Sequence, residues 1–217
     1  MDAEFWLACW QNDHLGFQLD DVHPMLQELL PQLALPTATK VFVPLCGKSL
    51  DLAFLAKSYS VVGAELSDIA CRDFFAQHQL EPSVSEATNN FRCYQTEQIT
   101  IWNGDFFNLP KQAITECQFI YDRAALVALP EAMRLQYAAK LLTLFKAGTK
   151  MLLISVDYPQ DEKVGPPFSV SKLELEALFP SASIKELAVQ DLTAKGFAKR
   201  KFSVSKLIET AYLISFN

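Results

Sequence analysis

The feature that most constrains the fold of this chain is the alternation of short, continuously apolar runs with runs of helical spacing. The apolar runs cover residues 40–45, 61–66, 119–122 and 150–156. Strands that are apolar throughout are typical of a parallel sheet with helices on both faces. The alternation therefore predicts an α/β fold with a mostly parallel sheet. Ligands of such sheets bind beyond the carboxyl ends of the strands.

Local signals place helices between these runs. Residues 49–57 and 171–178 have the spacing of short helices. Ser67 is a suitable N-cap for another helix, because its hydroxyl can accept a hydrogen bond from a free N–H of the first turn. The apolar stripe of that helix would comprise Cys71, Phe74, Phe75 and His78.

A longer helix is predicted to begin at Pro130 and to end at Gly148. Proline suits the first helical position, and glycine suits the residue that follows the last turn. The buried face of this helix would comprise Ala138, Leu141, Leu142 and Phe145.

Two further pairs of runs are predicted to be strands. Residues 91–94 and 99–102 are expected to form a hairpin, and residues 184–191 and 210–216 an antiparallel pair at one edge of the sheet. The chain has 217 residues, no internal repeat and no long linker, so one domain is expected over residues 1–217.

Composition limits the classes of protein to which the chain can belong. Hydrophobic residues make up 50%, which excludes a disordered chain. The formal net charge is −6, so neither nucleic acid nor an anionic membrane surface is an expected partner. No apolar run approaches the roughly 18 residues of a membrane span, and the first residues lack the basic region of a signal peptide. A cytoplasmic location is therefore expected.

The cysteine and histidine residues follow no metal-binding or disulfide pattern. The 5 cysteines include no CxxC pair, and the 3 histidines fall in no HExxH motif. We therefore expect neither a disulfide framework nor a bound metal.

The turn after the first apolar run reads PLCGKS, residues 44–49. A phosphate-binding loop ending in GKS needs glycine where this chain has Phe42, which argues against an NTPase. A dinucleotide fingerprint needs three glycines, and only Gly47 is present. The spacing of a nucleophile elbow is also absent. Taken alone, the turn is a plain strand-to-helix connection.

Acidic residues follow the next two strands. Glu65 ends the second strand 18 residues after Gly47, where an acid can accept both hydroxyls of a ribose. Its alternative role is that of a partner for the N-terminus of the next helix. Asp105 follows the third strand and could accept from an adenine amine, with Phe106 packing on the ring, although a turn aspartate is the commoner role. Together these acids indicate an adenosine ligand without a pyrophosphate, such as S-adenosylmethionine.

Two other groups are candidates for the site. Arg123 ends the fourth strand and could hold a cofactor carboxylate or stabilise an anionic acceptor, or form a structural ion pair. The first residues carry Trp6, Trp10 and Phe17, an aromatic stripe that is either core packing or a lid over a flat ligand.

The chain resembles the thiopurine S-methyltransferases of bacterial type. The resemblance runs in order along almost the whole chain and is carried by FWLACW (5–10), GF (16–17), VPLCGKSLDLAFLA (43–56), VVGAELS (61–67), GDFFNLP (104–110), YDRAALVALP (121–130), GPPFSV (165–170) and YLI (212–214).

This resemblance implies a Rossmann-like class I methyltransferase fold with a seven-stranded sheet, a helical lid over residues 1–35, and a cytoplasmic monomer. It implies S-adenosylmethionine as cofactor and no metal. The residues that it places at the cofactor are Trp10, Leu45, Glu65, Asp105, Phe106 and Arg123. On the acceptor side it places Phe17 and Arg123.

One position departs from the family. Mammalian members carry a second substrate-side arginine, and the residue that matches it here is Ala198. Lys199 or Arg200 could replace that arginine, although a solvated basic run is the simpler interpretation.

The sequence predicts an enzyme that transfers the methyl group of S-adenosylmethionine to the sulfur of thiopurines or other aromatic thiols, small-molecule acceptors. Arg123 is the residue expected to stabilise the acceptor anion. Selenium or tellurium species are alternative acceptors, and a non-catalytic sensor of an adenosine ligand is an alternative of a different class.

Overall fold

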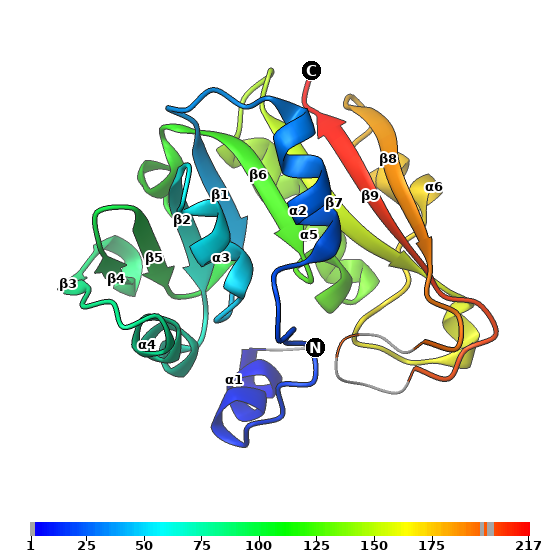
Figure 1. Ribbon diagram of the computed structural model, residues 1–217, viewed down its shortest axis with the longest axis horizontal. Helices are drawn as coiled ribbons and strands as arrows, with labels where there is room; N and C mark the ends of the chain where they lie inside the picture. The colour runs from blue at the N-terminus through cyan, green and yellow to red at the C-terminus, as the bar shows by residue number, and fades with distance from the viewer. Residues whose placement is uncertain (1–2, 196–197, 199–201) are drawn as a thin grey trace. The chain divides into compact units, whose positions relative to one another are not determined.

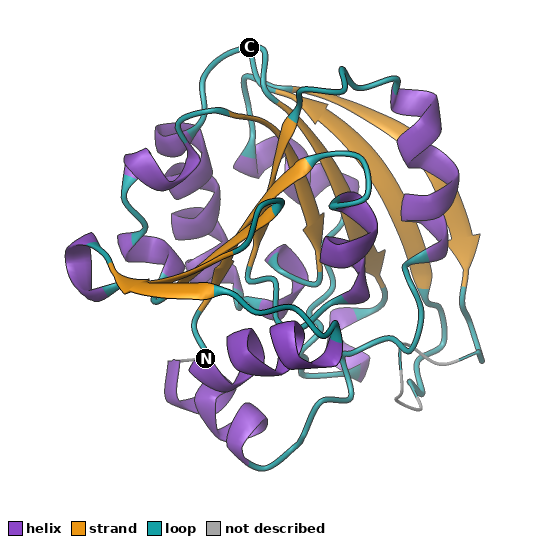
Figure 2. Cartoon of the chain, turned by 60° about the vertical axis from the view of Figure 1, so that its left-hand side comes forward, coloured by secondary structure: helices purple, strands orange, loops and turns teal. Residues whose placement is uncertain are grey.

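The computed structural model describes residues 3–195, 198 and 202–217. It divides into two compact units, residues 1–117 and residues 118–217. The described residues form nine strands and six α-helices. Helices and strands are distinguished by colour in Figure 2, and the labels of Figure 1 show that both kinds of element occur in each unit. The single domain expected over residues 1–217 stays a prediction.

The first unit holds five strands in the order β3-β4-β5-β2-β1. Strands β1, β2 and β5 are mutually parallel, whereas β3 and β4 are antiparallel to their neighbours. The predicted hairpin is confirmed as β4 and β5. The strands are β1 (Lys40–Pro44), β2 (Ser60–Glu65), β3 (Ser83–Glu86), β4 (Arg92–Gln95) and β5 (Ile99–Asn103).

Two of the four α-helices of the first unit follow serine residues, as the sequence predicted: a short helix from Ser49, and a helix with Ser67 as its N-cap. Ser49 Oγ accepts from the N–H of Asp51 at 3.2 Å, and Ser67 Oγ accepts from the N–H of Ala70 at 3.3 Å. Both are N-caps, which satisfy N–H groups that have no partner inside the helix. The α-helices are α1 (Ala3–Gln11), α2 (Pro24–Leu29), α3 (Leu50–Leu55) and α4 (Asp68–Gln77).

Helix α4 buries three of the four residues predicted for its apolar stripe. Cys71, Phe74 and Phe75 are buried. His78 instead lies one residue past the helix as its C-cap, with its ring 4.8 Å from that of Phe74. The short 3-10 turns of this unit are η1 (Leu30–Leu33), η2 (Thr88–Asn90), η3 (Phe106–Asn108) and η4 (Lys111–Ile114).

The second unit has four strands, in the order β6-β7-β9-β8. Strands β6 and β7 are parallel, and β9 is antiparallel to both β7 and β8, which confirms the predicted antiparallel edge pair. The elements are β6 (Cys117–Arg123), η5 (Leu126–Ala128), α5 (Glu131–Leu144), β7 (Lys150–Asp157), η6 (Gln160–Glu162), α6 (Lys172–Leu178), β8 (Ser183–Asp191) and β9 (Ile208–Ser215).

Two expectations about the sheet were wrong. The described part of the chain forms nine strands rather than seven. Within the units three pairings are parallel and four antiparallel, so the sheet is mixed rather than mostly parallel. All four residues of β3 are exposed, so no apolar run indicates that strand.

Helix α5 also differs from its prediction. It ends at Leu144, because Phe145 has turned to an extended conformation with ψ 151°. Gly148, with φ +87°, lies in the turn that leads to β7. Leu142 is 44% exposed, since it stands about 100° around the helix from the buried Leu141.

Candidate functional site

The turn after β1 is built on two residues in left-handed conformation. Leu45 has φ +46° and Gly47 has φ +53°. This conformation costs a non-glycine residue about 1–2 kcal/mol, so it persists only where surrounding contacts hold the chain. The N–H of Cys46 donates to the carbonyl of Ala64 at 3.0 Å, which ties the turn to β2.

Cys46 packs into this junction and is not available as a nucleophile. A methyl group at Gly63 would lie 2.7 Å from Cys46 Sγ, so only glycine in β2 allows the thiol to approach this closely. Burial, and then the nearby carboxylate of Glu65, raise the pKa of Cys46 well above its usual value. The side chain therefore stays a neutral thiol near neutral pH.

Glu65 lies at the end of β2 with 7% of its surface exposed. Its Oε2 accepts the N–H of Gly47 at 2.8 Å, and its Oε1 accepts the N–H of Ser67 at 2.7 Å. Burial raises the pKa of Glu65, and these backbone donors oppose the rise. The bond to Ser67 shows the helix-end role that was the alternative. Each carboxylate oxygen keeps a further lone pair for a ligand hydroxyl.

Asp105 and Phe106 have structural partners within the first unit. Asp105 is exposed, and its carboxylate accepts from the N–H of Phe107 and from Nδ2 of Asn108, both at 2.9 Å. It therefore caps η3, as the turn alternative expected. The ring of Phe106 is buried and stacks on Phe42, with centroids 6.3 Å apart. The adenine-side roles of both residues stay predictions.

Aromatic side chains of the N-terminal segment cover the turn after β1. A methyl group at Gly47 would lie 3.2 Å from Trp10 Cζ2 and 3.0 Å from Gln18 Nε2. Phe17 stands edge-on to Trp10 at 5.8 Å and to Trp6 at 5.6 Å. Trp10 is buried, with 6% of its surface exposed, whereas Trp6 and Phe17 are half-buried. The structure thus brings Trp10, with Phe17 beside it, to the turn that Glu65 also contacts.

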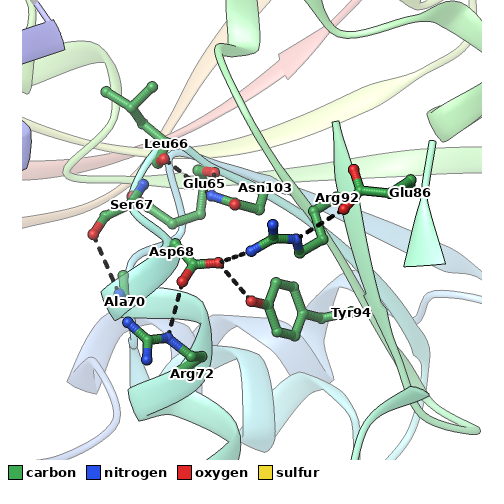
Figure 3. A network of polar contacts seen from close by, with 10 residues as sticks. All are labelled: Glu65, Leu66, Ser67, Asp68, Ala70, Arg72, Glu86, Arg92, Tyr94 and Asn103. Atoms are coloured by element: carbon green, nitrogen blue, oxygen red, sulfur yellow. Dashed lines mark hydrogen bonds and ion pairs between the residues drawn. The ribbon is translucent and has the colours of Figure 1, made fainter. Parts of the chain in front are cut away.

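Sequence reasoning missed three residues of this region. Gln18 packs against Gly47, and Lys48 lies 5.7 Å from the Trp10 ring while pairing with Asp73 at 2.9 Å. Asn103 donates through Nδ2 to the carbonyls at the end of β2 (Figure 3). An asparagine before Gly-Asp is an ordinary turn signal, so its sequence context does not indicate this contact.

A network around Asp68 fixes the first turn of α4 (Figure 3). The carboxylate accepts from Tyr94 Oη at 2.6 Å and pairs with Arg72 and Arg92, each at 2.9 Å. Burial alone would raise the pKa of Asp68, but the Tyr94 bond and the two guanidinium groups lower it. The network joins α4 to β4 directly after the strand end that carries Glu65.

In the second unit, Arg123 is the last residue of β6 and is half-buried. Its neighbour Asp122 is buried and accepts from Tyr137 Oη at 2.6 Å and from the N–H groups of Ala125 and Leu126. Burial raises the pKa of Asp122 to about 6. Through its bonds to the N–H groups of Ala125 and Leu126, Asp122 stabilises the turn after Arg123. The functional role of Arg123 stays a prediction.

Some predictions fall outside what the structure describes or concern absences. Lys199 and Arg200 lie outside the described residues, whereas Ala198 is described, with φ +52°.

In residues 3–195, 198 and 202–217, no group of three or more His, Cys, Asp or Glu side chains could hold a metal ion. All five cysteines are free and buried. Over those same ranges, no helix has the length and apolar character that crossing a bilayer requires.

Known proteins are similar to this chain over its whole length. The model of the family described as thiopurine S-methyltransferase matches residues 1–216. The chain is 44% identical over 216 residues to a thiopurine S-methyltransferase of Shewanella baltica, covering 99% of each chain. It is 43% identical to one of Vibrio vulnificus, covering 98% of this chain and 97% of the relative.

Among solved structures, an S-adenosylmethionine-dependent methyltransferase of Anabaena variabilis matches with a TM-score of 0.71. The match covers 99% of this chain and 95% of the other at 15% identity. At that identity the likeness shows the fold alone, and it confirms the predicted class I methyltransferase fold.

Proposed function

The chain belongs to the thiopurine S-methyltransferase family, and from this we propose that it transfers the methyl group of S-adenosylmethionine to the sulfur of thiopurines or other aromatic thiols. The observation that carries the proposal is the buried carboxylate of Glu65, held against the turn after β1 by the N–H of Gly47. We further propose that the protein acts as a cytoplasmic monomer on a small-molecule acceptor.

The residues of the first unit fit the nucleoside part of the cofactor. Glu65 has lone pairs left for two ribose hydroxyls, and a charged acceptor makes the stronger kind of hydrogen bond. A phosphate-binding loop would need glycine at position 42, where this chain has Phe42, inside β1. A buried acceptor beside a turn that does not bind phosphate suits an adenosine without phosphates, which is what S-adenosylmethionine presents.

When bound, S-adenosylmethionine would supply a methyl group on a sulfonium. An acceptor thiolate would form a bond to the methyl carbon as the bond from that carbon to the sulfonium breaks, with S-adenosylhomocysteine as the leaving group. The chain's own part is to align the reactants and to exclude water. We assign the exclusion of water to the aromatic cluster of Trp6, Trp10 and Phe17, whose rings lie edge to face at 5.6 and 5.8 Å. Phe17 is the ring of this cluster that we assign to the acceptor.

Arg123 is proposed to stabilise the anion of the acceptor. A guanidinium favours the ionised form of a nearby thiol and so increases the fraction present as the attacking thiolate. The competing assignment is that Arg123 holds the carboxylate of the cofactor. The two assignments predict different effects of substitution on the pH profile of the reaction.

The proposal is tested by methyl transfer from labelled S-adenosylmethionine to 6-mercaptopurine, with purine, which lacks the thiol, as matched control. We expect label in the thiol product alone and no transfer to purine. Transfer to selenite or tellurite without transfer to any thiol would overturn the assigned acceptor. Binding of S-adenosylhomocysteine without turnover of any acceptor would overturn the enzyme and favour a sensor.

A further inference from the structure

Asn103, the last residue of β5, reaches across to the end of β2 with its side-chain amide. Its Nδ2 donates to the carbonyl of Glu65 at 3.1 Å and to the carbonyl of Leu66 at 3.0 Å (Figure 3). Carbonyl oxygens only accept, so the nitrogen of the amide must face them and both of its hydrogens are used. The orientation of the Asn103 amide is thereby determined.

The carbonyl of Leu66 and the N–H of Ser67 belong to one peptide unit. That unit is planar, so fixing the direction of its carbonyl also fixes the direction of its N–H. The N–H of Ser67 donates to Glu65 Oε1 at 2.7 Å. Asn103 therefore binds the carbonyl of the Leu66–Ser67 peptide, and the N–H of the same planar peptide binds the carboxylate of Glu65.

The neighbouring backbone bonds hold Glu65 at other points. The N–H of Gly104 donates to the carbonyl of Glu65 at 2.8 Å, and the N–H of Gly47 donates to Oε2. These bonds fix the strand end and the second carboxylate oxygen. Neither bond involves the Leu66–Ser67 peptide, whose carbonyl accepts from Asn103 Nδ2.

We propose that Asn103 is a positioning residue for cofactor binding, which sets the Glu65 carboxylate by orienting the Leu66–Ser67 peptide. This rests on the proposed function, in which Glu65 accepts the ribose hydroxyls. Replacing Asn103 should then lower the affinity only for ligands that carry those ribose hydroxyls. A merely structural role would lower the affinity for any ligand of the site, with or without a ribose diol.

The test compares two ligands and two proteins. Affinities of the wild-type protein and of Asn103→Ala are measured by calorimetry for S-adenosylhomocysteine and for its 2′,3′-dideoxy analogue. We expect the substitution to weaken binding of S-adenosylhomocysteine about tenfold and to leave affinity for the analogue within about twofold, since groups in one network are coupled. Melting curves establish that the variant is folded.

Two further variants accompany the test. Asn103→Asp keeps the shape of the side chain but sets a carboxylate against two carbonyls, and we expect at least the same selective loss. Asn217→Ala is the matched control, because Asn217 Nδ2 also donates to a backbone carbonyl, that of Ser181 at 2.7 Å, at the exposed C-terminus. Its affinity for S-adenosylhomocysteine should equal that of the wild type.

The outcomes separate this inference from the proposed function. Equal losses for both ligands in Asn103→Ala and Asn103→Asp would overturn the positioning role while leaving Glu65 as the ribose acceptor. If the wild-type protein binds the dideoxy analogue as tightly as S-adenosylhomocysteine, the ribose role of Glu65 fails, and the inference fails with it.

Discussion

The carboxylate of Glu65 accepts the backbone N–H of Gly47 across 2.8 Å, which joins the end of β2 to the turn after β1. The end of β2 and the turn after its parallel neighbour β1 are thus joined by one buried carboxyl group. This contact brings the candidate ribose acceptor under the same turn that Trp10 covers.

Replacing Glu65 should weaken cofactor binding. Glu65→Ala leaves the ribose hydroxyls and two backbone N–H groups without an acceptor, and losing a charge-assisted bond costs about 1.5–3 kcal/mol. Glu65→Gln should also be impaired, because its amide would set a donor against one of those N–H groups. Calorimetry with S-adenosylhomocysteine measures both. Unchanged affinity in Glu65→Ala would leave Glu65 with the helix-end role alone.

Gly47→Ala should impair the site through packing as well as backbone strain. Its methyl group would meet Gln18 at 3.0 Å and Trp10 at 3.2 Å, and its φ of +53° costs about 1 kcal/mol or more. Gly148→Ala is the matched control, because its φ is +87° with no atom within 4 Å of the new methyl. We expect both variants to melt earlier and only Gly47→Ala to bind S-adenosylhomocysteine more weakly. Equal affinities in the two variants would contradict the packing role.

The aromatic cluster should become more protected when ligands bind. If residues 3–20 close over the site, their amide hydrogen exchange slows in the presence of both S-adenosylhomocysteine and an aromatic thiol. Peptides from α6 serve as the internal reference. Equal exchange over residues 3–20 with and without ligands would mean that Trp6, Trp10 and Phe17 are core packing only.

Arg123→Ala should lower kcat/KM and move the acid limb of its pH profile upward. Without the guanidinium, the acceptor thiol ionises nearer its free pKa, so a higher pH is needed to form the thiolate. Arg123→Lys keeps the charge but loses the planar fork and should be intermediate. A raised Kd for S-adenosylhomocysteine with an unmoved acid limb would indicate the cofactor carboxylate instead. A normal profile with normal cofactor affinity would exclude both roles.

Asp122→Asn should change how stability depends on pH. The pKa of Asp122 is raised to about 6 in the folded protein by burial, against about 4 in the unfolded chain. Between these values the folded state binds the proton more tightly, so stability falls as pH rises, by up to about 3 kcal/mol. Asparagine does not titrate, so the stability of the variant relative to wild type should rise from pH 4 to pH 6 and then level off.

Urea unfolding of both proteins across that range measures the effect, and the difference between them cancels all other titrating groups. Tyr137→Phe provides a comparison, because it removes the hydroxyl that donates to Asp122 at 2.6 Å while leaving the carboxyl buried. A difference between wild type and Asp122→Asn that is constant with pH would contradict the raised pKa.

The sequence by itself determined the elements whose signals are local. The β-branched runs of β1 and β2, the short helix after Ser49, the N-cap of α4 at Ser67, and the hairpin of β4 and β5 were predicted and are confirmed. Such signals extend over four to eight residues, and the backbone period and the capping hydroxyl act within that distance. The family motifs likewise indicated the fold and the methyl donor.

Only the tertiary structure decided how the side chains at the strand ends are used. Glu65 lies 18 residues from Gly47 and 38 from Asn103 in sequence, and its bonds to the turn and its peptide support arise only when β1, β2 and β5 pair in register. The exposed strand β3 likewise has no apolar run of its own and is a strand through its pairing with β4. A hydrogen bond needs its donor within about 3 Å, and sequence spacing does not specify which distant residue the folded chain brings that close.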